Sequence, residues 1–142
     1  MDGRGLFFED LAIGQSVQLT RVVGESDIAA FAAVSGDDNP VHLDAAFAAA
    51  TPFKERIAHG MLTASYISAL IGTRLPGPGA IYVSQTLQFK RPVKIGDEVT
   101  ARVEISGLDP VKGRVTFACA CLVGGKPVLE GEAVVIAPRR PA

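Results

Sequence analysis

Hydrophobic and polar residues alternate through most of the second half of the chain. Four stretches follow this period of two, at residues 81–89, 99–106, 115–123 and 127–136. Successive side chains of a strand point to opposite faces, so the pattern predicts four strands, each with one buried face. Glycine, proline and aspartate lie in the short gaps, as in tight turns. Strands joined by short turns predict an antiparallel sheet.

The first half has one short strand, at residues 16–23, followed by helical segments. Ser26 is a suitable N-cap and Gly36 a suitable C-terminal residue for the first helix. Asp44 can cap a second, alanine-rich helix over residues 45–50. These capping residues predict two helices separated by a polar segment.

A third helix is predicted over residues 60–71, ending at Gly72. Its apolar residues lie on nearly every side, which is typical of a buried helix. One strand, a buried helix and then four strands predict a single α+β domain over residues 1–142, with an antiparallel sheet wrapped around a central helix. The tail from about residue 137 is expected to fray.

The charged residues nearly balance, with 14 Lys and Arg against 15 Asp and Glu. This balance argues against nucleic acid as a partner, because a polyanion binder needs a basic surplus. Hydrophobic residues make up 48% of the chain and charged ones 20%, which excludes a disordered chain and suggests that a partner covers some apolar surface. The longest apolar stretch, residues 57–71, is interrupted by polar residues and falls short of the roughly 20 that a membrane helix needs, so no membrane partner is expected.

Cys119 and Cys121 are too few for a disulfide scaffold or for a four-ligand zinc site. Two positions apart on an extended segment, they point to the same face, and pairing them would strain the backbone. We expect two small buried thiols. Free thiols and the lack of an apolar leader in residues 1–10 predict a cytoplasmic location.

The densest polar cluster is residues 35–44, with the sequence SGDDNPVHLD. Pro40 interrupts a continuous helix and favours an extended Asn39, which predicts a shaped loop between two helices. Such a loop can direct Asp37 and His42 to one point, and a carboxylate with an imidazole is a standard pair for moving protons. Asp, Asn and Pro are also ordinary turn residues, so a surface loop with an incidental His42 is the alternative.

A second cluster, residues 57–62, lies at the start of the buried helix. A helix N-terminus leaves amide groups unpaired, and Gly60 has no side chain to keep a substrate oxygen away, which allows an oxyanion site. The alternative is that Gly60 fits a crowded backbone. For His59 we expect a structural hydrogen bond. Ser68 is a hydroxyl on an apolar helix and needs a partner, for which the Asp37 carboxylate would serve.

Other catalytic patterns are absent from the sequence. There is no G-x-S-x-G elbow, phosphate-binding loop or dinucleotide fingerprint. His42 and His59 are 17 residues apart without nearby cysteines, which argues against a metal site.

Two motifs resemble those of the MaoC-like (R)-specific enoyl-CoA hydratases: Asp37-x-Asn39-Pro40-x-His42-x-Asp44 and His59-Gly60-Met61. The resemblance extends over about residues 8–136, including a stretch like 81–89 followed by Pro92, Gly96 and Asp97. It implies a hot-dog fold, in which an antiparallel sheet wraps around a long central helix.

The resemblance also implies a reaction, the reversible hydration of a trans-2-enoyl-CoA to a (3R)-3-hydroxyacyl-CoA. By the resemblance, Asp37 and His42 hold and activate the water, and the Gly60 amide polarises the thioester carbonyl. Ser68 matches a serine that supports the catalytic aspartate, and Asn39 supports the loop. Coenzyme A enters with the acyl substrate, so neither a metal nor a redox cofactor is expected.

The resemblance further implies a homodimer with substrate entering near the interface, and an open edge strand suits such pairing. Two basic clusters are available for the coenzyme A phosphates: Lys90, Arg91 and Lys94, or Lys54 and Arg56.

Two other functions share the fold. A hot-dog thioesterase would release a free thiol, and a non-catalytic partner subunit of a dehydratase would bind acyl thioesters without turnover.

Overall fold

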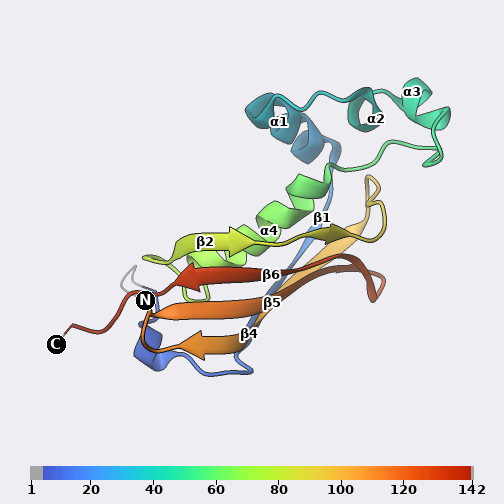
Figure 1. The fold of residues 1–142 in the computed structure, drawn as a ribbon. Coiled ribbons are helices and arrows are strands. Elements are labelled where there is room, and N and C mark those ends of the chain that lie inside the picture. The colour runs from blue at the N-terminus through green and yellow to red at the C-terminus, as the bar shows by residue number, and fades with distance from the viewer. Residues whose placement is uncertain (1–4, 142) are drawn as a thin grey trace.

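One antiparallel sheet and one long helix form the centre of the protein (Figure 1). The structure, a computed structural model, describes residues 5–141. Its strands are β1 (Ser16–Val22), β2 (Ile81–Gln85), β3 (Gln88–Phe89), β4 (Glu98–Asp109), β5 (Arg114–Val123) and β6 (Lys126–Ile136). Its helices are η1 (Phe8–Asp10), α1 (Glu25–Ser35), α2 (Pro40–Leu43), α3 (Ala45–Ala49) and α4 (Gly60–Thr73).

The sheet has the strand order β1-β4-β5-β6-β2, and β3 also pairs with β6. All of these pairs are antiparallel. Strands β1 and β2 therefore lie at the two edges. The predicted α+β arrangement of an antiparallel sheet around a central helix is confirmed.

The core lies between α4 and the inner face of the sheet. Every second residue of β4 and β5 is buried over most of their length, as the alternation predicts. Cys119 and Cys121 belong to this face, and both are buried free thiols, as predicted. The helix contributes the buried apolar side chains Leu62, Tyr66, Ile67, Leu70 and Ile71.

Helices α1, α2 and α3 lie next to the amino end of α4, beyond the end of the sheet (Figure 1). Gly36 ends α1 in the left-handed conformation, with φ 78°, and Asp44 accepts hydrogen bonds from the amides of Ala46 and Phe47 at the start of α3. Both predicted capping residues are therefore confirmed. This arrangement places the polar segment 35–44 beside the first turn of α4.

The helices differ from the sequence prediction in several places. The N-cap of α1 is Gly24 and not Ser26, because the Asp27 carboxylate accepts the Gly24 amide at 2.8 Å. The loop expected around Pro40 contains the short helix α2, since proline at a first helical position lacks only an N–H that would be unpaired. Helix α4 continues past Gly72, because a glycine inside a helix costs only about 1 kcal/mol.

The predicted strand over residues 81–89 is two strands, β2 and β3. Its register against β6 shifts between Tyr82 and Ser84. The carbonyl of Thr86 then lies so close to Gly131 of β6 that a β-carbon on that glycine would be 1.9 Å from the carbonyl oxygen. Strand β4 is longer than predicted, because its pairing with β5 continues beyond a bulge between Ile105 and Gly107.

The part of the C-terminal tail that the structure describes, residues 137–141, forms hydrogen bonds with other parts of the chain, while fraying of the tail stays a prediction. The Phe8 amide donates to the Pro138 carbonyl at 2.7 Å. The Arg140 amide donates to the Glu9 carboxylate at 2.6 Å, which holds the pKa of Glu9 below its usual range. No helix in the described part of the chain is long and apolar enough to cross a bilayer.

Candidate active site

The segment before α4 runs beside the polar loop and holds it in place. The Ile57 amide donates to the Val41 carbonyl at 3.3 Å. The Arg56 side chain donates through Nε to the His42 carbonyl at 2.7 Å and through Nη1 to the Glu25 carboxylate at 2.7 Å. One side chain therefore connects α1, α2 and the entry to α4.

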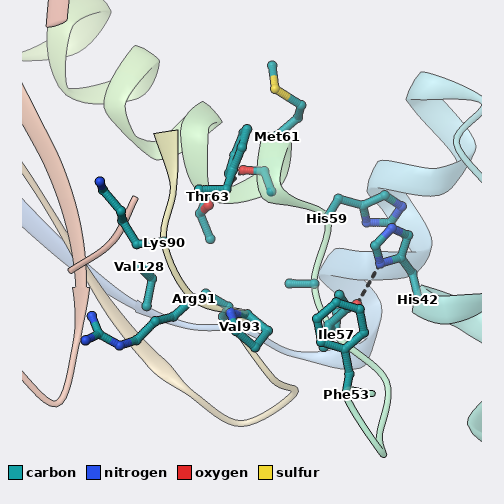
Figure 2. Close-up of a pocket in the computed structure, with 14 residues that line it drawn as sticks. His42, Phe53, Ile57, His59, Met61, Thr63, Lys90, Arg91, Val93 and Val128 are labelled. Carbon is teal, nitrogen blue, oxygen red and sulfur yellow. Dashed lines mark hydrogen bonds between the residues drawn. The ribbon is translucent and has the colours of Figure 1, made fainter. Parts of the chain in front are cut away.

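His42 is buried, with 8% of its surface exposed, and its ring orientation is fixed by one hydrogen bond. Nδ1 lies 2.8 Å from the Ile57 carbonyl oxygen, the contact drawn as a dashed line in Figure 2. A carbonyl oxygen can only accept, so Nδ1 carries the hydrogen and Nε2 has the free lone pair of the neutral ring. Such an imidazole can take up and return a proton at Nε2.

Asp37 and His42 converge, as the sequence predicts. One carboxylate oxygen of Asp37 and one ring nitrogen each from His42 and His59 all lie within 4.8 Å of one another. Asp37 is exposed in the single chain, and its carboxylate accepts the Asn39 amide at 3.3 Å. The Asn39 side chain in turn accepts the Val41 amide at 3.1 Å and so caps α2, the helix that carries His42.

These three groups also include the atom types that bind metal ions. Two of their ring nitrogens, Nδ1 of His42 and Nε2 of His59, already lie on carbonyl oxygens. At most one nitrogen of each ring is therefore available to coordinate a metal ion. The expectation that no metal is needed stays a prediction.

Gly60 is the first residue of α4, and its N-cap is His59. The first amides of a helix have no partner within the helix and carry partial positive charge. Within the described residues, no hydrogen bond of the Gly60 amide is found. An oxyanion donor is therefore available next to the Asp37–His42 pair.

A cavity of about 440 Å³ opens at this point. Its lining is largely apolar and includes His42, Gly60 and Phe89. Lys90 and Arg91 lie across the cavity from His42 (Figure 2). Its size and lining suit an acyl thioester, and the two cations add positive charge at one side.

The basic residues considered for phosphate binding do not form one cluster. The Arg56 side chain is occupied by the loop contacts described above. Lys94 forms an ion pair with Glu55 at 3.5 Å. Of the candidate residues, only Lys90 and Arg91 line the cavity, while the Arg91 guanidinium also donates to the Pro127 carbonyl at 2.7 Å.

Ser68 does not reach Asp37 within one chain. It lies two turns, or about 12 Å, further along α4 than Gly60. Its side chain is exposed, and among the described residues it makes no hydrogen bond with Asp37. The predicted contact is therefore wrong for a single chain.

His59 has the structural hydrogen bond that the sequence predicts, and it contacts more of the site than expected. Its Nε2 lies 2.9 Å from the Asp37 carbonyl oxygen, and its ring stacks on His42. Sequence reasoning missed Arg56 as a loop contact and Phe89 as a cavity residue. The sequence around Arg56 is equally consistent with an ordinary surface cation, and the sequence around Phe89 with an ordinary strand residue.

Comparison with known protein families matches residues 9–121 to the MaoC-like domain. The chain belongs to the MaoC-like family. It is 58% identical over 134 residues to the (R)-specific enoyl-CoA hydratase of Rhodospirillum rubrum, covering 94% of this chain and 93% of that protein. It is 53% identical over 137 residues to the 3-hydroxybutyryl-CoA dehydratase of Methylorubrum extorquens, covering 96% and 87%.

Solved structures support the same family. The unliganded R-hydratase PhaJ1 of Pseudomonas aeruginosa superposes with a TM-score of 0.90 at 51% identity, covering 96% of this chain and 88% of that one. The (R)-hydratase of A. caviae superposes with a TM-score of 0.89 at 49% identity, covering 92% and 99%. This MaoC-like chain has the predicted hot-dog fold.

Proposed function

We propose that the chain is an (R)-specific enoyl-CoA hydratase, a hydro-lyase that reversibly converts trans-2-enoyl-CoA to (3R)-3-hydroxyacyl-CoA. The observation that carries the proposal is the convergence of Asp37 and His42, with His42 and the first residue of α4 both lining an acyl-sized cavity. The names of the similar proteins, two hydratases and a 3-hydroxybutyryl-CoA dehydratase, agree with it.

The proposed chemistry needs three tasks at one place. A proton leaves the water as its oxygen bonds to C3, a proton is delivered to C2, and the thioester oxygen carries negative charge in between. Asp37 and His42 hold the water and perform the two proton transfers. The Gly60 amide donates to the thioester oxygen, and the dipole of α4 adds to that stabilisation.

The substrate brings its coenzyme A, and no metal or redox cofactor takes part in the proposed reaction. The enoyl group enters the apolar cavity with its thioester at Gly60. We place the phosphates near Lys90, whose ammonium group is the more available of the two cavity cations because Arg91 is bonded to the Pro127 carbonyl. Ammonium groups bind phosphate as point charges.

We also propose that the working form is a homodimer in which a second copy supplies Ser68. Edge strand β2 has exposed apolar side chains, including Ile81 at 60% and Val83 at 42% exposure. Five exposed residues of α4 form one continuous helical stripe: Met61, Ser65, Ser68, Ala69 and Gly72. In the proposed dimer the partner pairs at β2, covers this stripe and supplies its Ser68 to the Asp37 carboxylate of the other copy.

The test is to mix purified protein with crotonyl-CoA and follow both the conjugated enoyl-thioester absorbance and free thiol. Loss of absorbance without thiol release is the expected result. Thiol release would instead support a hot-dog thioesterase. Binding of crotonyl-CoA without either change, repeated with longer enoyl-CoAs, would support a non-catalytic partner subunit.

A further inference from the structure

His59 is a deeply buried polar side chain beside the proposed catalytic pair, with 2% of its surface exposed. Its Nε2 lies 2.9 Å from the Asp37 carbonyl oxygen. Its ring stacks on the His42 ring, with centroids 3.9 Å apart and planes inclined by 28°. Figure 2 shows the two histidine rings side by side at the edge of the cavity. His59 therefore contacts both members of the pair and directly precedes Gly60.

The carbonyl contact fixes where the hydrogen of His59 lies. A carbonyl oxygen only accepts, so Nε2 carries the hydrogen and the neutral ring has its lone pair on Nδ1. Nδ1 is buried, and within the described residues it has no hydrogen-bond partner. His42 has the opposite arrangement, because its Nδ1 donates to the Ile57 carbonyl.

An unpaired buried acceptor is destabilising, so an apolar ring would fill this position better if packing were its only role. The His59 ring also contacts the Phe31 ring of α1, with centroids 4.8 Å apart and planes inclined by 48°. The ring thus contacts both α1 and the His42 ring. These ring contacts and the hydrogen bond at Nε2 restrict where the His59 ring can lie.

We infer that His59 is a positioning residue for the proton-transfer pair. Its Nε2–H holds the backbone of Asp37, which sets where the Asp37 carboxylate lies, and its ring fixes the plane of His42. The inference rests on the proposed function, because it assigns His59 a part in that reaction. His59 borders the cavity, but only 2% of its surface is exposed, so we assign it a role through Asp37 and His42 and not direct contact with the reacting atoms.

Three substitutions separate the hydrogen bond from the ring. His59→Gln keeps an N–H donor with a reach close to that of Nε2, and His59→Asn has the same amide one methylene closer to the backbone. His59→Phe keeps the ring and removes the donor. Each is measured for kcat and KM with crotonyl-CoA, alongside its melting temperature and the wild-type protein.

We expect His59→Asn and His59→Phe to lose about 100-fold in kcat, the cost of a small misplacement of catalytic groups. KM should change little, because the substrate contacts are intact. His59→Gln should recover most of the lost kcat. Wild-type kcat in a folded His59→Phe variant, or equal losses in all three variants, would overturn the inference.

A second measurement does not depend on turnover. The chain has two histidines, so imidazole nitrogen NMR of untagged protein contains only two rings to assign. We expect His59 to carry its hydrogen on Nε2 and His42 on Nδ1, and His59→Phe to shift the His42 signals. Hydrogen on Nδ1 of His59 would overturn the inference. An inactive wild-type protein with the expected tautomers would instead count against the proposed function.

Discussion

The ring of Phe89 lies directly against the α-carbon of Gly60. A β-carbon on Gly60 would be 2.5 Å from Cε1 and 2.7 Å from Cδ1 of that ring, closer than real β-carbons approach other atoms. Phe89 is 54% exposed and lines the cavity, so its ring forms part of the wall at the proposed oxyanion site. Glycine at this position therefore keeps both the amide accessible and the aromatic wall in place.

Gly60→Ala is expected to move the Phe89 ring into the cavity and to lower kcat/KM for crotonyl-CoA by about 100-fold, with the protein still folded. The double variant Gly60→Ala with Phe89→Ala removes the clash. It should recover part of the loss relative to Gly60→Ala alone. Steady-state kinetics of the two variants and of Phe89→Ala make the comparison, and an equally impaired double variant would refute the steric account.

Asp37→Asn and His42→Ala are each expected to lower kcat by about 100- to 10,000-fold, the usual effect of losing an acid–base group. Asp37 is exposed in the single chain, so the melting temperature of Asp37→Asn should stay close to that of the wild-type protein. Asp38→Asn is the matched control, because Asp38 is the exposed neighbour with the same side chain. Full activity of Asp37→Asn, or inactivity of Asp38→Asn, would mean that the wrong carboxylate has been chosen.

The proposed homodimer predicts a mass of twice the chain's 14.8 kDa by light scattering at micromolar concentration. Ser68→Ala should lower kcat by about tenfold or more, the size of one hydrogen bond to a charged group. Mixed dimers of one Asp37→Asn chain and one Ser68→Ala chain then test whether Ser68 acts in its own chain or in the partner. If it acts across the interface, each mixed dimer regains one intact site and activity rises.

Two results would contradict this account of Ser68. A monomeric mass would leave no second copy to supply it. Mixed dimers no more active than their parents would mean that Ser68 acts within its own chain or away from the site. Tagging one chain allows the mixed dimer to be isolated before the assay.

The two thiols provide a test of the core that does not involve the active site. Burial raises the pKa of Cys119 to about 11 and that of Cys121 to about 12, from an ordinary value of 9.0. Thiol reagents attack the thiolate, so neither residue should react in the folded protein at pH 8, and both should react once it is unfolded. Rapid labelling of the folded protein would contradict the burial of both thiols.

The raised pKa values of Cys119 and Cys121 also predict how the free energy of unfolding changes at high pH. As pH rises past 9.0, the unfolded chain loses its thiol protons first, while the folded protein keeps them until pH approaches 11 to 12. The free energy of unfolding should therefore begin to fall above about pH 9. Denaturant unfolding at several pH values measures this fall.

Local patterns in the sequence predicted the features that depend on neighbouring residues. The alternation predicted β4, β5 and β6, and Gly36 and Asp44 predicted two helix ends. The short spacing between Asp37 and His42 predicted that their side chains lie close together. The two residues are separated only by a tight segment in which the Asn39 side chain caps the helix that carries His42.

The features that the sequence did not predict depend on distant partners. The break between β2 and β3 follows from the approach of Thr86 to Gly131. The tail hydrogen-bonds to Glu9, near the other end of the sequence, and no periodic pattern predicts that contact. The predicted contact between Ser68 and Asp37 is missing in a single chain for a similar reason, since the proposed partner of Ser68 lies on a second copy.

The central claim is that this chain adds water to an enoyl thioester with one stereochemistry. The most direct measurement identifies the product from crotonyl-CoA with dehydrogenases specific for (3R)- or (3S)-3-hydroxybutyryl-CoA. We predict that only the (3R) enzyme oxidises the product and that Asp37→Asn yields almost none. A (3S) product, or the same yield from Asp37→Asn, would contradict the account.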